Sequence, residues 1–125
     1  TNKENLTYEF IKTSKVLSIA VLSKETPLSF IGRFGFKSGR EIDKFEGINY
    51  KVGRSGTPIV LDNTLAYVEA KVINEADLGT HSVFIAQMVD SDILKEGEPI
   101  TYEYYTNVLR GPTGKRAPLY FEEIW

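Results

Sequence analysis

The sequence contains no cysteine and only one histidine, His81, among its 125 residues. Without cysteine the chain forms no disulfide, zinc ribbon or iron–sulfur site and performs no thiol chemistry. With one histidine it cannot supply a site of several histidines, and we predict no metal site. A Ser-His-Asp triad would depend on His81 as its base, and no Gly-x-Ser-x-Gly stretch marks a nucleophile. Triad catalysis is therefore disfavoured.

The sequence also lacks a strong excess of either charge and any long apolar run. Lys and Arg total 15 against 17 Asp and Glu, whereas a non-specific nucleic-acid binder normally carries a basic excess. No apolar run approaches the ~20 residues that a membrane span requires, and the first residues do not resemble a secretory signal. We therefore expect no nucleic-acid or membrane partner, a cytoplasmic location, and a single domain over residues 1–125.

The hydrophobic pattern of the first half predicts short helices around one strand. Residues 6–13 carry apolar groups near one face after a plausible N-cap, Asn5. Residues 16–22 form a nearly continuous apolar run, which is typical of a strand buried on both faces. Thr26 and Pro27 indicate a helix start, with Gly35 as its stop. We expect residues 38–45 to form a loop that leads into a short helix.

The second half has the pattern of β structure. A strand over 59–61 is followed by a turn at Asp62 and Asn63, and strands over 65–73 and 81–89 are joined by a turn over 74–79, which predicts a hairpin. Residues 100–105 indicate a last, aromatic strand, and the tail from 109 onward is irregular. We expect a mainly β fold, a β-barrel with short helices, in which dimerisation would help to bury the core. Tyr120 and Trp125 hint that the tail lies against a partner subunit.

Residues 35–40 combine two glycines, a serine hydroxyl and two cations just before the expected short helix. Glycines let backbone N–H groups approach an anion, and a helix N-terminus favours negative charge, so this segment is suited to hold a phosphate. Its spacing is neither that of a Walker loop nor that of a Rossmann fingerprint. Positive charge is concentrated nearby, in Arg33, Lys37, Arg40, Lys44, Lys51 and Arg54. A solvated glycine-rich loop remains the alternative.

Two further features leave alternatives open. His81 begins a predicted strand, where it either bonds the backbone or lines a ligand pocket as a donor or acceptor. The tyrosines at 102, 104 and 105 either stack on a planar ligand or pack within the protein.

Several segments, in order, resemble the flavin reductase-like, FMN-binding split-barrel family, especially the branch of flavoredoxins and of the flavin reductase domain of high-molecular-weight rubredoxins. The segments are residues 2–7, 16–22, 34–45, 79–89 and 100–105. Members of this family usually carry a further N-terminal stretch that supplies the first barrel strands. The resemblance therefore implies a split barrel that is incomplete at its N-terminus in this sequence.

The resemblance implies an oxidoreductase that passes electrons from NAD(P)H through bound FMN to a flavin, metal or protein acceptor. By this resemblance, the FMN phosphate is held by Lys37, Ser38, Gly39 and Arg40, with Lys44 as a further candidate. Asn2, Lys3 and Thr7 contact the ring or ribityl side, and His81 lies near the flavin face where a nicotinamide stacks. A homodimer and a redox protein partner are also implied. The alternatives are an FMN-binding electron carrier without its own nicotinamide site, and a truncated, non-catalytic fragment.

Overall fold

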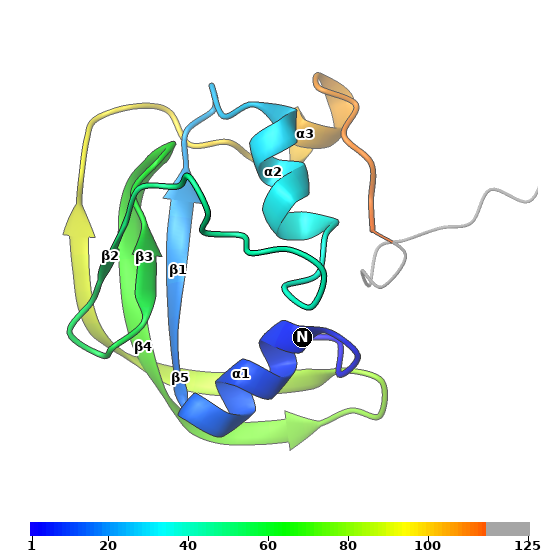
Figure 1. Ribbon diagram of the computed structural model, residues 1–125, viewed down its shortest axis with the longest axis vertical. Coiled ribbons are helices and arrows are strands. Elements are labelled where there is room, and N and C mark those ends of the chain that lie inside the picture. The colour runs from blue at the N-terminus through cyan, green and yellow to red at the C-terminus, as the bar shows by residue number, and fades with distance from the viewer. Residues whose placement is uncertain (115–125) are drawn as a thin grey trace, which may run out of the picture.

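The computed structural model describes residues 1–114 and contains two antiparallel β layers with three short helices (Figure 1). No helix within that range is both long enough and apolar enough to cross a lipid bilayer. The elements in chain order are α1 (Leu6–Ser14), β1 (Val16–Leu22), α2 (Leu28–Gly35), β2 (Tyr50–Val52), β3 (Pro58–Val60), β4 (Thr64–Asp77), β5 (Ser82–Ile93) and α3 (Tyr102–Asn107).

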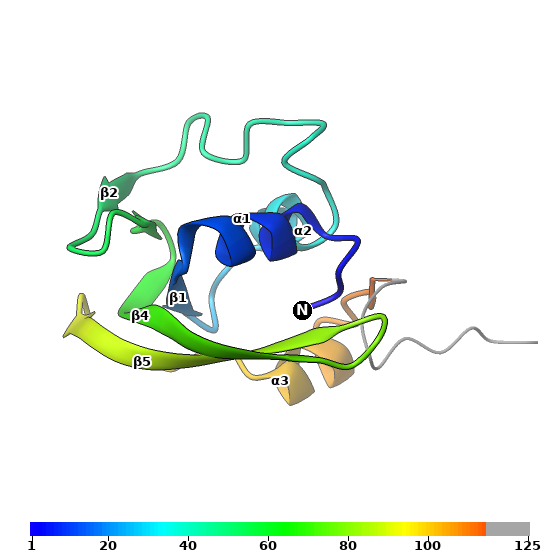
Figure 2. The ribbon, with the colours of Figure 1, turned by 90° about the horizontal axis from the view of Figure 1, so that it is seen from below.

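A three-stranded antiparallel sheet, in the order β1-β4-β5, forms the frame, and β2 pairs with β3 in a separate hairpin. Helices α1 and α2 lie on the same side of the long β4–β5 hairpin (Figure 2). Tyr8 fixes α1 there, because its ring lies 5.8 Å from that of Phe84 and its hydroxyl donates to the Glu75 carboxylate. The mainly β architecture is confirmed. Within residues 1–114, however, the strands form a sheet and a hairpin rather than a closed barrel.

The expected helix over 6–13 and strand over 16–22 are confirmed, with one difference in burial. Asn5 is the N-cap residue of α1, although its side chain makes no capping hydrogen bond. The second helix begins at Leu28, one residue later than expected, because Pro27 is its cap. In β1 the side chains of Ile19 and Val21 are exposed within the described chain, so this strand is not buried on both faces. One of them, Ile19, faces the cavity described below.

The predicted hairpin is confirmed, but the turn predicted over 74–79 begins too early, because residues 74–77 belong to β4. Strand β4 continues to Asp77, which pairs with Ser82, and β5 continues to Ile93. The Ser82 hydroxyl donates to the Glu75 carboxylate at 2.7 Å. Polar residues that suggest a turn thus form a hydrogen bond between the two strands. The chain reverses only at residues 78–81, where Gly79 has a φ of 92°.

Two other predicted elements are also wrong. Residues 100–105 do not form a strand: α3 begins at Tyr102, because the Thr101 hydroxyl accepts a hydrogen bond from the Tyr104 N–H and caps the helix. Residues 38–45 lead into no helix and form successive turns. The Arg33 guanidinium donates to the backbone carbonyls of residues 43, 44 and 46 and so holds these turns against α2.

The buried core is small, and most of its members lie on β4. Its apolar members are Ile59, Leu65, Tyr67, Ala70 and Tyr105. Leu65, Tyr67 and Glu69 alternate along β4 and are buried, so they mark an inner face of this strand. The expected turn at Asp62 and Asn63 is confirmed, with a φ of 59° at Asn63. Tyr120 and Trp125 lie outside the described residues.

Candidate functional site

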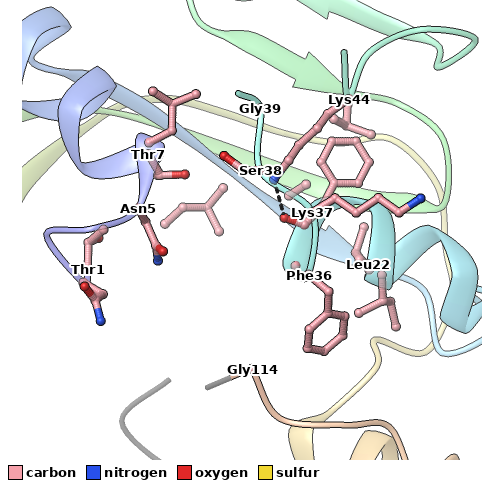
Figure 3. A pocket seen from close by; sticks show the side chains of 18 of the residues that line it. Thr1, Asn5, Thr7, Leu22, Phe36, Lys37, Ser38, Gly39, Lys44 and Gly114 are labelled. Carbon is pink, nitrogen blue, oxygen red and sulfur yellow. Dashed lines mark hydrogen bonds between the residues drawn. The ribbon is translucent and has the colours of Figure 1, made fainter. Parts of the chain in front are cut away.

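An open cavity of about 1400 Å³ lies between the N-terminal segment, the loop after α2, strand β3 and the segment that includes α3. In Figure 3, Thr1, Asn5 and Thr7 line one side, and Phe36, Ser38 and Gly39 lie across from them. Backbone contacts hold the N-terminal side in place: Asn2 forms a β-bridge with His81, and the Lys3 N–H donates to the Thr80 carbonyl. Segments far apart in the sequence therefore form one site.

Eight of the nine residues predicted to act on a cofactor line this cavity. They are Asn2, Thr7, Lys37, Ser38, Gly39, Arg40, Lys44 and His81. Lys3 is the exception, because its ammonium pairs with the Asp77 carboxylate at 2.5 Å and it does not line the cavity. That hydrogen bond is also the largest cause of a lowered pKa at Asp77.

Lys37 is a cation at the cavity that is available to bind a ligand. Its side chain is exposed at the end of the loop that follows α2, and it has no hydrogen-bond or ion-pair partner among residues 1–114. An unpaired ammonium at a cavity wall attracts an anionic ligand without first breaking an internal contact. Lys37 is therefore the strongest candidate of the set for contact with a phosphate.

Arg40 and Ser38 are already engaged within the protein. The Arg40 guanidinium lies 2.8 Å from the Glu9 carboxylate and also contacts the Glu4 carbonyl. The Ser38 hydroxyl accepts a hydrogen bond from the Arg40 N–H, which fixes the turn. Because no helix follows this segment, the anion site expected at a helix N-terminus is absent here. What remains is a turn with polar groups and one available cation.

Lys44 has a structural contact at the base of the same loop. Its ammonium donates a hydrogen bond of 2.7 Å to the carbonyl of Phe34, near the end of α2. Partial burial lowers the pKa of Lys44. Cations near a helix C-terminus are stabilised by the helix dipole, so Lys44 ties the loop to α2.

His81 lies where the β4–β5 turn meets the N-terminal segment. Its Nδ1 shares a 2.9 Å hydrogen bond with the Thr80 hydroxyl. Its Nε2 is shielded from solvent and has no hydrogen-bond partner in the described chain. A buried polar atom without a partner carries a free-energy cost of roughly 1–3 kcal/mol. Such atoms deserve a functional explanation, and this one belongs to a residue at the cavity wall.

Glu69 is a site-supporting residue that the sequence interpretation missed. Its carboxylate is fully buried and accepts hydrogen bonds from the Ser55 hydroxyl and N–H and from the Arg54 N–H. The Ser55 hydroxyl is the largest cause of a lowered pKa at Glu69. A side chain at Gly53 would collide with this carboxylate. Glu69 thus fixes the β2–β3 turn, whose strand β3 forms one wall of the cavity.

The missed role of Glu69 has only a weak signal in the sequence. Gly53, Ser55 and Gly56 indicate a turn, but nothing in the spacing connects that turn to a carboxylate 14 residues further along, on the strand that follows β3. The sequence interpretation also missed Tyr67. This residue lines the cavity, and its hydroxyl accepts a hydrogen bond from the Lys51 ammonium at 3.2 Å.

Comparisons with known proteins agree with the fold and the order of the segments. A family model described as flavin reductase like domain matches residues 1–112. The chain is 55% identical over 119 residues to a high molecular weight rubredoxin of Moorella thermoacetica, covering 95% of this chain and 52% of that protein. It is 45% identical over 121 residues to a ferric-chelate reductase (NAD(P)H) of Archaeoglobus fulgidus, covering 97% of this chain and 72% of that protein. The chain thus spans about half the length of the first relative.

Solved structures show the same fold. A nitrilotriacetate monooxygenase component B from Mycobacterium thermoresistibile superposes with a TM-score of 0.67 at 26% identity, covering 78% of this chain and 53% of that one. An FMN-binding protein from Thermus thermophilus superposes with a TM-score of 0.66 at 22% identity, covering 74% of this chain and 51% of that one.

Proposed function

We propose that this chain, which belongs to the flavin reductase-like family, binds FMN in the described cavity. In this proposal electrons pass from NAD(P)H through the bound FMN to a flavin, metal or protein acceptor. The observation that carries the proposal is the convergence of eight predicted site residues on one cavity. These residues come from segments as distant as positions 2, 37 and 81.

The chemistry of the cavity fits FMN. A phosphate dianion matches the available Lys37 ammonium and the turn at Ser38, and a polyol chain matches the amide of Asn2 and the hydroxyl of Thr7. A planar apolar ring matches the wall formed by β3. Ligand pockets usually measure about 300–1000 Å³, so the cavity is large enough for this cofactor.

Bound flavin supplies the redox chemistry, and the residues of this chain bind and orient it. Lys37 would neutralise charge, Ser38 would contribute a hydroxyl, and Pro58 to Val60 would cover one side. Arg40 holds the turn against α1 through Glu9 rather than meeting the ligand first. His81 offers an imidazole beside the position proposed for the flavin face.

The relatives support a choice of acceptors. One is named a ferric-chelate reductase (NAD(P)H), which favours a metal acceptor, and the other is named a rubredoxin, which favours a redox protein partner. We also propose a homodimer. Strand β5 is an edge of the sheet and exposes apolar side chains, among them Ile85, Met88 and Ile93, which a second copy would cover.

Flavin titration and rapid mixing test the proposal. We expect added FMN to bind the purified chain with quenched fluorescence, and NADH or NADPH to bleach the flavin absorbance. Bleaching by a protein donor but by neither nicotinamide would support the electron-carrier alternative. A chain that takes up no FMN would contradict both and support the non-catalytic alternative.

A further inference from the structure

Glu75 lies on β4 outside the cavity lining, and its carboxylate binds donors from two separate elements. The Ser82 hydroxyl, at the start of β5, donates to Oε1 of this carboxylate at 2.7 Å. The Tyr8 hydroxyl, on α1, donates to the same oxygen at 3.3 Å, and the Lys12 ammonium lies 3.9 Å from Oε2. One carboxylate therefore joins the first helix to the β4–β5 hairpin.

Both hydroxyl donors lie next to residues of the cavity in the sequence. On α1, Tyr8 directly follows Thr7, which lines the cavity. At the start of β5, Ser82 directly follows His81, which also lines the cavity. Ser82 holds the N-terminal segment as well, because its N–H donates to the Thr1 carbonyl at 2.8 Å. Three segments that line the cavity are thus connected through a single carboxylate.

The carboxylate is suited to this task because it is ionised and because Ser82 depends on it. The Ser82 hydroxyl is the largest cause of a lowered pKa at Glu75, so this side chain is negatively charged at neutral pH. Hydrogen bonds to a charged acceptor are about twice as strong as those between neutral groups. Ser82 is fully buried, and the Ala76 carbonyl at 3.4 Å is the only other acceptor of its hydroxyl in the described chain. Loss of the carboxylate would therefore leave a buried hydroxyl poorly paired and force a local rearrangement.

We propose that Glu75 is a positioning residue of the ligand site, which acts through Tyr8 and Ser82 and does not touch the ligand. By binding both hydroxyls, its carboxylate fixes how Thr7 and His81 lie relative to each other at the cavity. The proposal rests on the proposed function, because the ligand concerned is the FMN of that same cavity. It assigns part of the FMN affinity to a carboxylate outside the cavity lining.

Fluorescence titration with FMN compares two substitutions of this carboxylate. Glu75→Leu removes the acceptor, and we expect it to weaken FMN binding by about 10-fold or more, the lower end of the range for loss of a partner that orients a binding residue. Glu75→Gln keeps an amide oxygen that accepts from both hydroxyls, so it should recover most of the affinity. Glu98→Leu is the matched control, because Glu98 also forms an ion pair, with Lys24, but lies outside the cavity lining. This variant should bind FMN as the wild-type chain does.

A double-mutant cycle separates positioning from general destabilisation. Tyr8→Phe and Ser82→Ala each remove one donor and should weaken FMN binding by roughly 2- to 10-fold, which corresponds to one hydrogen bond. In the Glu75→Leu chain the same two substitutions should cause no further loss, because the acceptor is already gone. Losses that add in full overturn the proposal, as does wild-type affinity in Glu75→Leu. If Glu75→Leu does not fold, the two donor variants decide alone, and unchanged affinity in both of them overturns the proposal.

The imidazole of His81 gives a second measurement that needs no FMN. His81 is the only histidine of the chain, so the proton between its two ring nitrogens gives a single assignable NMR signal. We expect this signal to move in the ligand-free Glu75→Leu chain and to keep its position in Glu98→Leu. A signal that keeps its position in Glu75→Leu overturns the positioning role. If the wild-type chain binds no FMN, the proposed function fails, and the NMR signal still decides whether Glu75 positions His81.

Discussion

The Arg40 guanidinium and the Glu9 carboxylate lie 2.8 Å apart and join the loop after α2 to the first helix. The pair is exposed, so its direct contribution to stability is small, roughly 0–1 kcal/mol. Its importance is geometric, because it holds a cation-rich turn beside the cavity while leaving Lys37 without a partner in the described chain. Two neighbouring cations of one motif thus have different roles.

The first prediction concerns these two cations. We expect Lys37→Ala to weaken FMN binding by roughly 10- to 100-fold, since a charge-assisted contact to the phosphate is lost. Arg40→Ala should weaken it less, because Arg40 is paired with Glu9, and the double variant should weaken it most. Fluorescence titration measures all three. Lys71→Ala, an exposed cation outside the cavity, serves as the control, and FMN affinity that is unchanged in the double variant would show that the phosphate lies elsewhere.

The second prediction concerns the buried carboxylate. We expect Glu69→Gln to lower the free energy of unfolding by roughly 2–3 kcal/mol, because donors of the β2–β3 turn lose a charged acceptor. Glu25→Gln, at an exposed position, is the control and should change it little. Denaturant unfolding at neutral pH measures the difference. Wild-type stability in the Glu69→Gln chain would contradict the role assigned to this carboxylate.

The third prediction follows from the lowered pKa of Glu69. A carboxylate with a depressed folded-state pKa contributes stability that is present above its unfolded pKa, near 4.5, and is lost as the pH falls through the lower folded value. Below pH 4.5 the unfolding free energy of the wild-type chain should therefore fall more steeply than that of Glu69→Gln. Denaturant midpoints recorded over this range give both slopes, and parallel slopes would refute the prediction.

The fourth prediction concerns the helix that replaces the expected last strand. Thr101→Ala removes the oxygen that accepts the Tyr104 N–H and should cost about 1 kcal/mol of stability. Thr101→Ser retains a hydroxyl and should recover most of the loss. Thermal unfolding measures both variants. If the serine variant is as unstable as the alanine variant, the cap is not the cause.

The fifth prediction tests the homodimer. A lysine in place of Met88 puts a charge on the apolar edge strand β5 and should shift the chain toward monomer, because burying an unpaired ammonium is costly. Gln87→Lys adds the same charge at a polar position of that strand and is the control. Sedimentation velocity gives the oligomeric state. A wild-type chain that sediments as a monomer would remove the basis of the proposal.

Local patterns in the sequence predict the elements whose signals lie within one segment. The apolar spacing of α1 and the long hairpin of β4 and β5 follow from helical and strand periodicity. The strand expected over 100–105 failed because one cap at Thr101 outweighs the strand preference of the aromatic residues. In place of the helix expected after residue 38 the structure has successive turns, whose carbonyls accept hydrogen bonds from Arg33 of the preceding helix, a contact that the local pattern does not predict.

The residues of the candidate site were predicted largely through family resemblance. Their contacts within the protein were not predicted. Residue types identify Lys37, Arg40 and Lys44 as possible anion ligands, but only the structure shows that Glu9 and the Phe34 carbonyl engage two of them. The burial of Glu69 depends on how the β2–β3 hairpin folds back over the strand that follows it. Such long-range pairings leave no periodic signal.

The cavity takes residues from both extremities of the described chain, with Asn2 at one end and Thr113 at the other. A small molecule that fills the cavity therefore contacts both the first residues of the chain and the last described segment. Because such a molecule binds only the assembled walls, its binding energy adds to the work of opening the whole chain. The occupancy of the cavity and the free energy of unfolding are then linked, and the chain with a bound ligand should resist heat and proteases better than the empty chain.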